Sequence, residues 1–262
     1  PSGGDAMTIN RRKLLTGGAG AAALTAAPAA AQTKRSMKWD HVADVVVVGA
    51  GATGLPAAIV AREAGAEVIL VEAESHLGGH AICSGGNLPL GGGTAFQKKW
   101  GVTDSPDLIF RDLTDWSVTS ENGAADYRYN DREIIRAFAD NNVATYDFLV
   151  SHGVVLVDKA PDTRGGISVG SSIAREMHCA PVDWPLIQTG KPAKPEDRLT
   201  ISTGNGLMHP LIAAARKAGV KILTSHKMKS LHRQGGKSGP VTGIVADANG
   251  RQVRIHARKA VI

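Results

Sequence analysis

One segment near the start of the chain restricts its possible folds more than any other. Residues 44–48 form the run Asp-Val-Val-Val-Val, which leads directly into Gly-Ala-Gly-Ala-Thr-Gly at positions 49–54. A continuous β-branched run predicts a strand that is buried on both faces, as in a parallel sheet. A helix is predicted from there to about Ala64, and a second apolar strand ends at Glu72. This order predicts a βαβ unit of a doubly wound, Rossmann-like α/β fold.

Each glycine of the turn has a physical role in this prediction. Gly49 allows the tight turn, Gly51 lets the backbone approach a pyrophosphate, and Gly54 lets the helix pack on the strand. The phosphates would lie at the helix N-terminus, where free N–H groups and the helix dipole favour negative charge. Glu72 follows Gly49 by 23 residues and is placed to accept hydrogen bonds from an adenosine ribose. A carboxylate there argues against a 2′-phosphate, so the segment predicts a dinucleotide other than NADP.

A second glycine-rich segment narrows the choice of dinucleotide. Residues 73–86 read Ala-Glu-Ser-His-Leu-Gly-Gly-His-Ala-Ile-Cys-Ser-Gly-Gly, a segment that an NAD site does not require. FAD is longer than its ADP half, so its ribityl chain and flavin ring need further close approach of the backbone. Paired glycines provide surfaces without side chains, and Ser84 can donate to a phosphate or flavin oxygen. The segment therefore predicts FAD.

These motifs resemble the FAD-binding domain of the fumarate reductase and succinate dehydrogenase flavoprotein superfamily. That superfamily includes soluble fumarate and urocanate reductases and 3-ketosteroid dehydrogenases. The resemblance covers most of residues 42–157 and 199–262. It implies that the two glycine segments and the end of the second strand line FAD, with the backbone of Met228 beside the adenine. The candidate cofactor-binding residues are Gly49, Ala50, Gly51, Ala52, Thr53, Gly54, Glu72, Ala73, Gly79, His80, Ser84, Gly85, Gly86 and Met228.

The histidines and cysteines bear on covalent flavin attachment, disulfide pairing and metal binding. Some members of the superfamily attach FAD through a histidine one residue further from the Gly-Gly pair than His80, so the spacing favours noncovalent FAD. Cys83 and Cys179 could pair in an oxidising compartment, but two separate buried side chains are the simpler expectation. His178 stands beside Cys179 without a second cluster at ligand spacing, so no metal site is predicted.

The middle of the chain differs in character from its flanks. Between residues 158 and 198 glycine and proline interrupt every pattern, which predicts a surface excursion. In the superfamily this region lies near the substrate, so it supplies candidate substrate contacts, with a variable loop as the alternative reading. The candidates are Arg164, Arg175, His178 and Trp184.

The carboxy-terminal part predicts the rest of the sheet. A block that opens at Gly204 is similar to a helix of the superfamily, and the helix itself is expected from Leu207 to Ala218, followed by a parallel strand at 221–225. Strands at 241–246 and 252–256 flank Asn-Gly at 249–250, a strong hairpin signal. We therefore expect an antiparallel β-meander appended to the parallel sheet. Residues 258–262 are similar to a final strand that precedes a flavin loop in the superfamily.

Residues 1–31 resemble a twin-arginine export signal. Asn-Arg-Arg-Lys-Leu-Leu at 10–15 is followed by an Ala- and Gly-rich apolar stretch and by Ala-Ala-Ala before Gln32. We expect cleavage, export to the periplasm, and no stable membrane span afterwards. Residues 1–6 precede the first methionine and are expected to be non-native; residues 32–41 are expected to be a linker. The FAD domain is assigned to 42–262 and is expected to be truncated, since domains rarely end inside a strand.

Charge and resemblance together set the functional expectation. The net charge is +6, and the first 31 residues contribute +2 of it (Arg11, Arg12 and Lys13 against Asp5). The remaining basic residues are spread along the chain without a long basic run. This pattern is unlike the basic stripe of a nucleic-acid-binding protein, so no nucleic-acid partner is expected. The resemblance implies an exported FAD-dependent oxidoreductase that transfers a hydride to or from a small substrate activated by a carbonyl or carboxylate, with an electron-transfer protein as a further partner. A 3-ketosteroid-type dehydrogenase and a noncatalytic flavin-binding relay are the alternatives. The superfamily's catalytic residues would lie beyond Ile262, so none is nominated.

Overall fold

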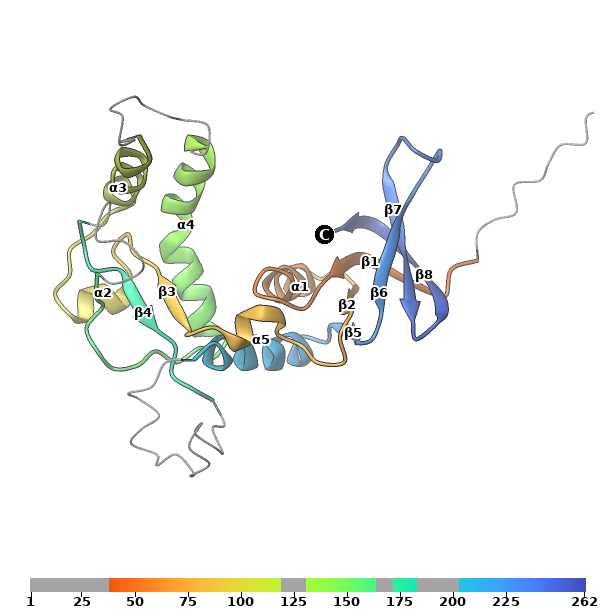
Figure 1. The fold of residues 1–262 in the computed structure, drawn as a ribbon, viewed down its shortest axis with the longest axis horizontal. Coiled ribbons are helices and arrows are strands. Elements are labelled where there is room, and N and C mark those ends of the chain that lie inside the picture. The colour runs from red at the N-terminus through yellow and green to blue at the C-terminus, as the bar shows by residue number, and fades with distance from the viewer. Residues whose placement is uncertain (1–37, 119–130, 164–171, 183–202) are drawn as a thin grey trace, which may run out of the picture. The chain divides into compact units, whose positions relative to one another are not determined.

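A computed structural model describes residues 38–118, 131–163, 172–182 and 203–262. The expected export signal, most of the expected linker, and two candidate substrate contacts, Arg164 and Trp184, lie outside the described residues. The described strands form a six-stranded sheet of order β5-β2-β1-β8-β7-β6 and a two-stranded sheet of β3 and β4 (Figure 1). The predicted α/β class is confirmed.

The predicted βαβ unit is present and is continued by the next parallel strand. Its elements are β1 (His41–Val48), α1 (Gly54–Glu63), β2 (Val68–Val71), α5 (Asn205–Lys217) and β5 (Lys221–Leu223). β1 and β2 are parallel with Val45 opposite Val68, and β2 pairs in parallel with β5. The parallel strands β1, β2 and β5, connected through α1 and α5, therefore have the Rossmann-like arrangement that the glycine turn predicted.

An antiparallel meander extends the sheet beyond β1. Its strands are β6 (Lys227–Arg233), β7 (Val241–Ala248) and β8 (Arg251–Val261). Asn249 and Gly250 form the predicted hairpin turn, with φ angles of 54° and 85°. β8 is one strand that pairs antiparallel with β7 and parallel with β1. The separate strands expected at 252–256 and 258–262 are thus a single strand, because no turn-forming residue interrupts the chain between them.

The parallel sheet is covered on both faces, which explains the unbroken valine run of β1. Val45 and Val47 pack in an apolar cluster with Leu55 of α1. Val46 belongs to a different cluster, which it shares with Ile244 of the meander. Successive side chains of a strand point to opposite faces, so helices and meander form the outer layers around the parallel strands. Figure 1 shows α1 and α5 on one side of these strands and β6 and β7 on the other.

The remaining elements form a second group of helices and short strands. They are η1, a 3₁₀ helix (Gly79–Cys83), β3 (Asn87–Pro89), α2 (Ala95–Lys99), α3 (Pro106–Val118), α4 (Arg132–Ser151) and β4 (Glu176–His178). α4 begins at Arg132, because the Asp131 carboxylate caps the helix by accepting hydrogen bonds from the backbone N–H groups of Glu133 and Ile134. No helix in the described ranges has both the length and the hydrophobicity needed to span a bilayer.

The expected surface excursion is partly wrong. Of residues 158–198, the segment 172–182 is packed into the fold. Met177 and Cys179 are fully buried in the apolar cluster that also contains Leu55 of α1. β4 pairs antiparallel with β3, and the N–H of Cys179 donates to the carbonyl of Gly86. Met177 and Cys179, two residues apart, place apolar side chains on one buried face of this segment, a signal that the surrounding glycines and prolines obscure.

Candidate functional site

The turn after β1 contains glycines that the fold requires and one that it does not. A Cβ atom on Gly54 would lie 1.9 Å from the carbonyl oxygen of Gly49, so α1 can approach the turn only with glycine at that position. Gly49 itself has a φ of 97°, in the region that favours glycine. Gly51 has no left-handed φ, and a Cβ atom there would meet nothing within 4 Å. The folded chain does not need glycine at position 51, whereas a closely approaching pyrophosphate does.

α1 begins beside this turn with its N-terminus open to an anion. Thr53 occupies the N-cap position, but its side chain makes no capping hydrogen bond. Ala52 and Thr53 are both exposed. In the first turn of α1 the N–H of Leu55 donates to the carbonyl of Gly51 at 3.1 Å, and Pro56 has no N–H. The attraction for an anion therefore comes from the backbone at the exposed residues 52 and 53 and from the helix dipole, which favours negative charge at this end. These features fit a phosphate group at the predicted position.

Glu72 at the end of β2 points toward the glycine turn. Its Oε2 accepts a hydrogen bond from the N–H of Ala50 at 2.7 Å, and its Oε1 accepts one from the N–H of Glu74 at 3.0 Å. Only 9% of the residue is exposed. Hydrogen bonds to a charged acceptor are stronger than neutral ones. The carboxylate therefore holds the glycine turn in place. The sequence predicted only a ribose contact for Glu72 and not this structural role.

Replacing this carboxylate should weaken both the fold and the site. In Glu72→Ala the buried N–H of Ala50 loses its acceptor, which should lower the free energy of unfolding by about 1–3 kcal/mol. FAD affinity should fall as well, since Ala50 belongs to the turn. Chemical denaturation and a fluorescence titration with FAD measure the two effects. Glu74→Ala is the control because its side chain is exposed; equal stability and affinity of the two variants would contradict the role of Glu72.

The second glycine segment lies directly against the first. The N–H of Gly78 donates to the carbonyl of Ala50 at 2.9 Å. A Cβ atom on Gly79 would lie 3.4 Å from the Cα of Gly51. Gly78 and Gly79 have φ angles of 113° and 52°. The structure thus brings the two segments together into one glycine-lined surface, as a cofactor that contacts both would require.

The loop at Ser84 is supported from behind by the start of α5. The N–H of Gly204 donates to the carbonyl of Ser84 at 2.8 Å, and a Cβ atom on Gly204 would lie 1.9 Å from the carbonyl oxygen of Ala81. The Ser84 hydroxyl donates to the same Ala81 oxygen at 2.8 Å and accepts from the N–H of Gly86 at 3.2 Å. It must rotate to donate to a flavin oxygen. Sequence reasoning placed Gly204 only at a helix start and missed this packing role.

Met228 and Ala73 belong to two chain segments that are held side by side by a backbone hydrogen bond. Met228 lies near the start of β6 and is 36% exposed. Two residues earlier, the N–H of His226 donates to the carbonyl of Glu72 at 2.8 Å. This bond holds the chain entering β6 beside the end of β2, where Ala73 is exposed. The adenine contact of Met228 stays a prediction.

The remaining loop candidates are accessible, and the two cysteines do not pair. His80 and Gly85 are exposed. Cys83 is exposed and Cys179 is buried, and both thiols are free. The expectation of separate cysteines is confirmed, but the expectation that both are buried was wrong, because Cys83 lies at the end of the exposed η1 turn. Burial raises the pKa of the Cys179 thiol to about 12, so this thiol stays protonated and unreactive.

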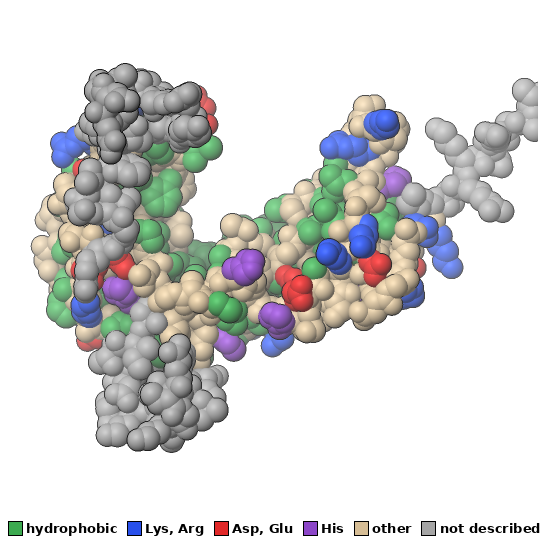
Figure 2. Space-filling view, viewed as in Figure 1, with side chains coloured by type: hydrophobic (Ala, Val, Ile, Leu, Met, Phe, Trp, Pro, Cys, Tyr) green, Lys and Arg blue, Asp and Glu red, His purple; other side chains and the backbone are tan. Residues whose placement is uncertain are grey.

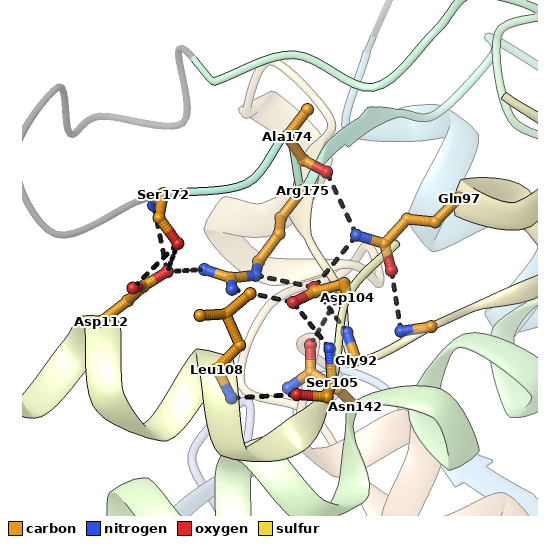
Figure 3. A network of polar contacts seen from close by, with 12 residues as sticks. Gly92, Gln97, Asp104, Ser105, Leu108, Asp112, Asn142, Ser172, Ala174 and Arg175 are labelled. Carbon is orange, nitrogen blue, oxygen red and sulfur yellow. Dashed lines mark hydrogen bonds and ion pairs between the residues drawn. The ribbon is translucent and has the colours of Figure 1, made fainter. Parts of the chain in front are cut away.

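Arg175, a candidate substrate contact, is instead the centre of a buried ion-pair network (Figure 3). Its guanidinium donates to both carboxylate oxygens of Asp104, at 2.8 and 2.9 Å, and to Asp112 at 2.8 Å. The Asp104 side chain is fully buried and that of Arg175 is 9% exposed. Gln97 also donates to Asp104, and Ser172 donates to Asp112. The network ties α2, α3 and the segment before β4 together and leaves Arg175 committed to structure.

The network also sets the ionisation of its carboxylates. Burial opposes the charged form of Asp104, but hydrogen bonds from Arg175, Gly92 and Gln97 outweigh it and hold its pKa below the ordinary value. For Asp112, burial is likewise outweighed by hydrogen bonds from Ser172 and Arg175, so its pKa is also lowered. Both groups are therefore charged at neutral pH, and the fold depends on their staying so.

The basic residues of the meander lie on its exposed edge. Lys227 and Lys229 are exposed on β6, the edge strand of the sheet, where lysines discourage pairing with other chains. On the face of the described residues that Figure 2 shows, Lys and Arg side chains are scattered among neutral and acidic ones. This distribution fits a solvated edge and agrees with the absence of a long basic run in the sequence.

The cavity beside the C-terminal half of α5 does not coincide with the glycine surface. A cavity of about 840 Å³ lies among α1, α4 and α5, and its lining includes Arg62, His152 and His209 but none of the candidate cofactor residues. A second cavity, of about 500 Å³, contains one of them, Ala52. Glycine turns form an open surface rather than an enclosed hole, so the chemistry of the site and not cavity size identifies it.

Two touching glycine turns, an uncapped helix N-terminus and a buried carboxylate after the next strand define a dinucleotide-binding α/β domain. The length of this glycine surface, which continues past the first turn to residues 78–86, fits FAD. Residues 44–262 match the family model described as "FAD binding domain", and the chain belongs to this family.

Individual relatives agree with this assignment. The acrylate reductase flavoprotein subunit of Shewanella woodyi is 30% identical over 97% of this chain and 45% of its own length. Fumarate reductase (cytochrome) of Shewanella frigidimarina is 32% identical over 52% of this chain and 24% of its own. The solved structure of 3-ketosteroid-Δ4-(5α)-dehydrogenase from Rhodococcus jostii RHA1 has a TM-score of 0.67 at 27% identity, covering 88% of this chain and 47% of that one. The chain spans less than half the length of these relatives.

Proposed function

We propose that this chain is the FAD-binding part of an FAD-dependent oxidoreductase that forms or reduces a carbon–carbon double bond beside a carbonyl or carboxylate. The observation that carries the proposal is Gly51, a glycine that the fold does not need, facing open space beside the second glycine segment. When bound, FAD supplies hydride transfer at its flavin ring. This chain's residues hold it: the first turn and α1 bind the pyrophosphate, Glu72 faces the ribose, and residues 84–86 lie toward the flavin.

The substrate class follows from the chemistry of the compounds that the relatives' names contain. Fumarate and acrylate each have a double bond conjugated to a carboxylate, and 4-androstene-3,17-dione has one conjugated to a ketone. A small unsaturated carboxylate is the first candidate, because the acrylate reductase subunit matches 97% of this chain. A 3-ketosteroid is the second, because the steroid dehydrogenase structure has a TM-score of 0.67. An electron-transfer protein is the expected redox partner.

An anaerobic activity screen tests this proposal. The full natural protein, loaded with FAD, is supplied with a reduced dye and fumarate, acrylate, urocanate or a 3-ketosteroid, and with an oxidised dye for the reverse direction. Turnover with a carboxylate supports the first candidate, and turnover with the steroid supports the second. Bound FAD without turnover of any of them would indicate a noncatalytic flavin-binding relay and contradict the oxidoreductase proposal.

FAD is expected to be bound without a covalent link. His80 lies on η1 and is exposed, and its spacing from Gly78 and Gly79 favours noncovalent binding. Precipitating the FAD-loaded protein with acid should leave the yellow colour in the supernatant, and His80→Ala should not change this result. Colour that stays with the pellet of the wild-type protein, and leaves it in His80→Ala, would show a histidyl–flavin bond instead.

We also propose that the protein is exported to the periplasm by the twin-arginine route. The support is the Arg11-Arg12 pair, the apolar stretch after it and the small residues before Gln32. Cell fractionation should find the mature protein in the periplasm, and replacing both arginines by lysine should retain the precursor in the cytoplasm. A wild-type protein found only in the cytoplasm would contradict the proposal.

A further inference from the structure

Three side chains that the sequence separates converge on one face of the small sheet. Glu176 and His178 are two residues apart on β4, so their side chains share a face. Asp162 forms an antiparallel bridge with Glu176 from the other side of β4. Ligand atoms from these three residues all lie within 4.8 Å of one another. The sequence predicts no metal here, because no second cluster stands at ligand spacing from His178; the fold brings Asp162 beside it.

The orientation of His178 presents a lone pair to two carboxylates. Its Nδ1 lies 3.2 Å from the amide oxygen of Asn87, which can only accept, so Nδ1 carries the proton. In the neutral ring, Nε2 then has a lone pair. Nε2 lies 3.6 Å from a carboxylate oxygen of Asp162 and 4.0 Å from one of Glu176. Three acceptor groups therefore face one another. The ammonium of Lys159 lies 3.2 Å from the Asp162 carboxylate, so the groups that a further cation would satisfy are Glu176 and His178.

Glu176 gives an independent sign that something is bound. Its side chain is 4% exposed, and its Oε2 is buried with no hydrogen-bond partner among the described residues. The Nε2 atom of His178 is also buried and has no hydrogen-bond partner among the described residues. Buried carboxylates are normally paired or bound to a cation. The neighbouring Arg175 cannot serve, since its guanidinium is committed to Asp104 and Asp112.

We propose that Asp162, Glu176 and His178 bind a divalent transition-metal ion, Zn²⁺ or Mn²⁺, with water completing the coordination. One imidazole nitrogen with carboxylate oxygens suits these ions. Ligand atoms bound to one zinc ion at about 2.1 Å can be at most about 4.2 Å apart. Both distances from Nε2 fall within this limit, and all three ligand atoms lie within 4.8 Å of one another. Asn87 orients the imidazole, as outer-shell groups do at metal sites.

The position of the site indicates a structural role. β4 contacts β3 on one side and the segment ending at Asp162 on the other. Just past the site, the N–H of Cys179 donates to Gly86, which closes the predicted flavin loop. A bound ion would fix the segment around Asp162 to β4. It would thereby stabilise β4, whose following residue Cys179 contacts this loop. A structural ion stabilises the folded state because it binds the unfolded chain weakly.

Metal titration of the chelator-treated protein tests the proposal. Calorimetry with zinc chloride or manganese chloride should show one tight site per chain and a higher Tm. Glu176→Gln and His178→Ala should each reduce the affinity at least tenfold. His209→Ala removes an exposed histidine outside the cluster and should leave binding unchanged. No binding, or equal binding by all four proteins, would overturn the proposal and leave an imidazolium between the carboxylates as the explanation.

A further variant keeps the test decisive should the first two fail to fold. The ammonium of Lys159 lies 3.2 Å from Asp162, and its side chain is 51% exposed. This cation competes with a metal for the same carboxylate, and its removal does not uncover the core. Lys159→Gln should therefore bind the ion more tightly than the wild type, by several-fold. Weaker binding by Lys159→Gln would contradict a metal site at these residues.

Discussion

Replacing Arg175 by methionine should lower the free energy of unfolding by about 3–5 kcal/mol, because it leaves the fully buried Asp104 carboxylate without its counterion. For a domain of this size that loss corresponds to a Tm lower by about 6–20 °C. Thermal and urea unfolding followed by circular dichroism measure both quantities. The expected loss is large because Asp112 also loses its positively charged partner and keeps only the hydrogen bonds from Ser172.

An exposed arginine provides the matched control. Arg136 pairs with Asp107 and Asp140 on the surface, with a side chain that is 33% exposed. Surface pairs contribute about 0–1 kcal/mol, so Arg136→Met should shift stability only slightly. Equal effects of the two substitutions would contradict the buried network.

The same network gives a pH dependence with a defined sign. The pKa values of Asp104 and Asp112 are lowered in the folded state. Their contribution to stability is therefore present above the unfolded carboxyl pKa of about 3.9 and is lost as the pH falls through the folded values. The stability difference between wild type and Arg175→Met should be largest near neutral pH and should shrink below about pH 4. A difference that grows on acidification would contradict this account.

Gly51→Val should abolish FAD binding while leaving the apoprotein folded. The valine side chain would fill the open space beside the turn that the pyrophosphate needs, and nothing within 4 Å of the added Cβ opposes it in the protein. We expect the affinity for FAD to fall at least 100-fold, about 2.8 kcal/mol, with little change in the Tm of the apoprotein. Fluorescence titration with FAD and thermal unfolding measure the two effects separately.

Gly54 provides the opposite control within the same turn. A methyl group there would lie 1.9 Å from the Gly49 carbonyl oxygen, so Gly54→Ala should destabilise the apoprotein itself. The two variants therefore separate a glycine used by the ligand from a glycine used by the fold. Gly51→Val with wild-type affinity would show that no phosphate approaches this position.

The parts of the fold that follow from local pattern were predictable from the sequence. The valine run and glycine turn predicted β1, α1 and β2, and Asn249-Gly250 predicted the hairpin of β7 and β8. In each case, neighbouring residues carry the information: β-branching, glycine conformation and the alternation of apolar residues. The two glycine segments were expected to share one ligand, and the Gly78–Ala50 hydrogen bond brings them together.

What the sequence did not reveal depends on residues that are distant in the chain. Arg175 and Asp104 are separated by 71 positions, and a charged residue in a Gly- and Pro-rich stretch is read most simply as exposed. Gly204 supports the loop at Ser84 through contacts that no periodicity encodes. Asp162 joins Glu176 only through β4 pairing. Tertiary packing decides these positions, and a single sequence does not record it.

Calorimetric titration of the purified chain with FAD tests the central claim most directly. We predict saturable binding of one FAD per chain, competition by ADP, which shares the half held by the first glycine turn and Glu72, and loss of the signal in Gly51→Val. FMN, which lacks that half, should bind far more weakly. No saturable FAD binding, or FMN binding as tight as FAD with no competition by ADP, would contradict the assignment of this chain's glycine surface to FAD.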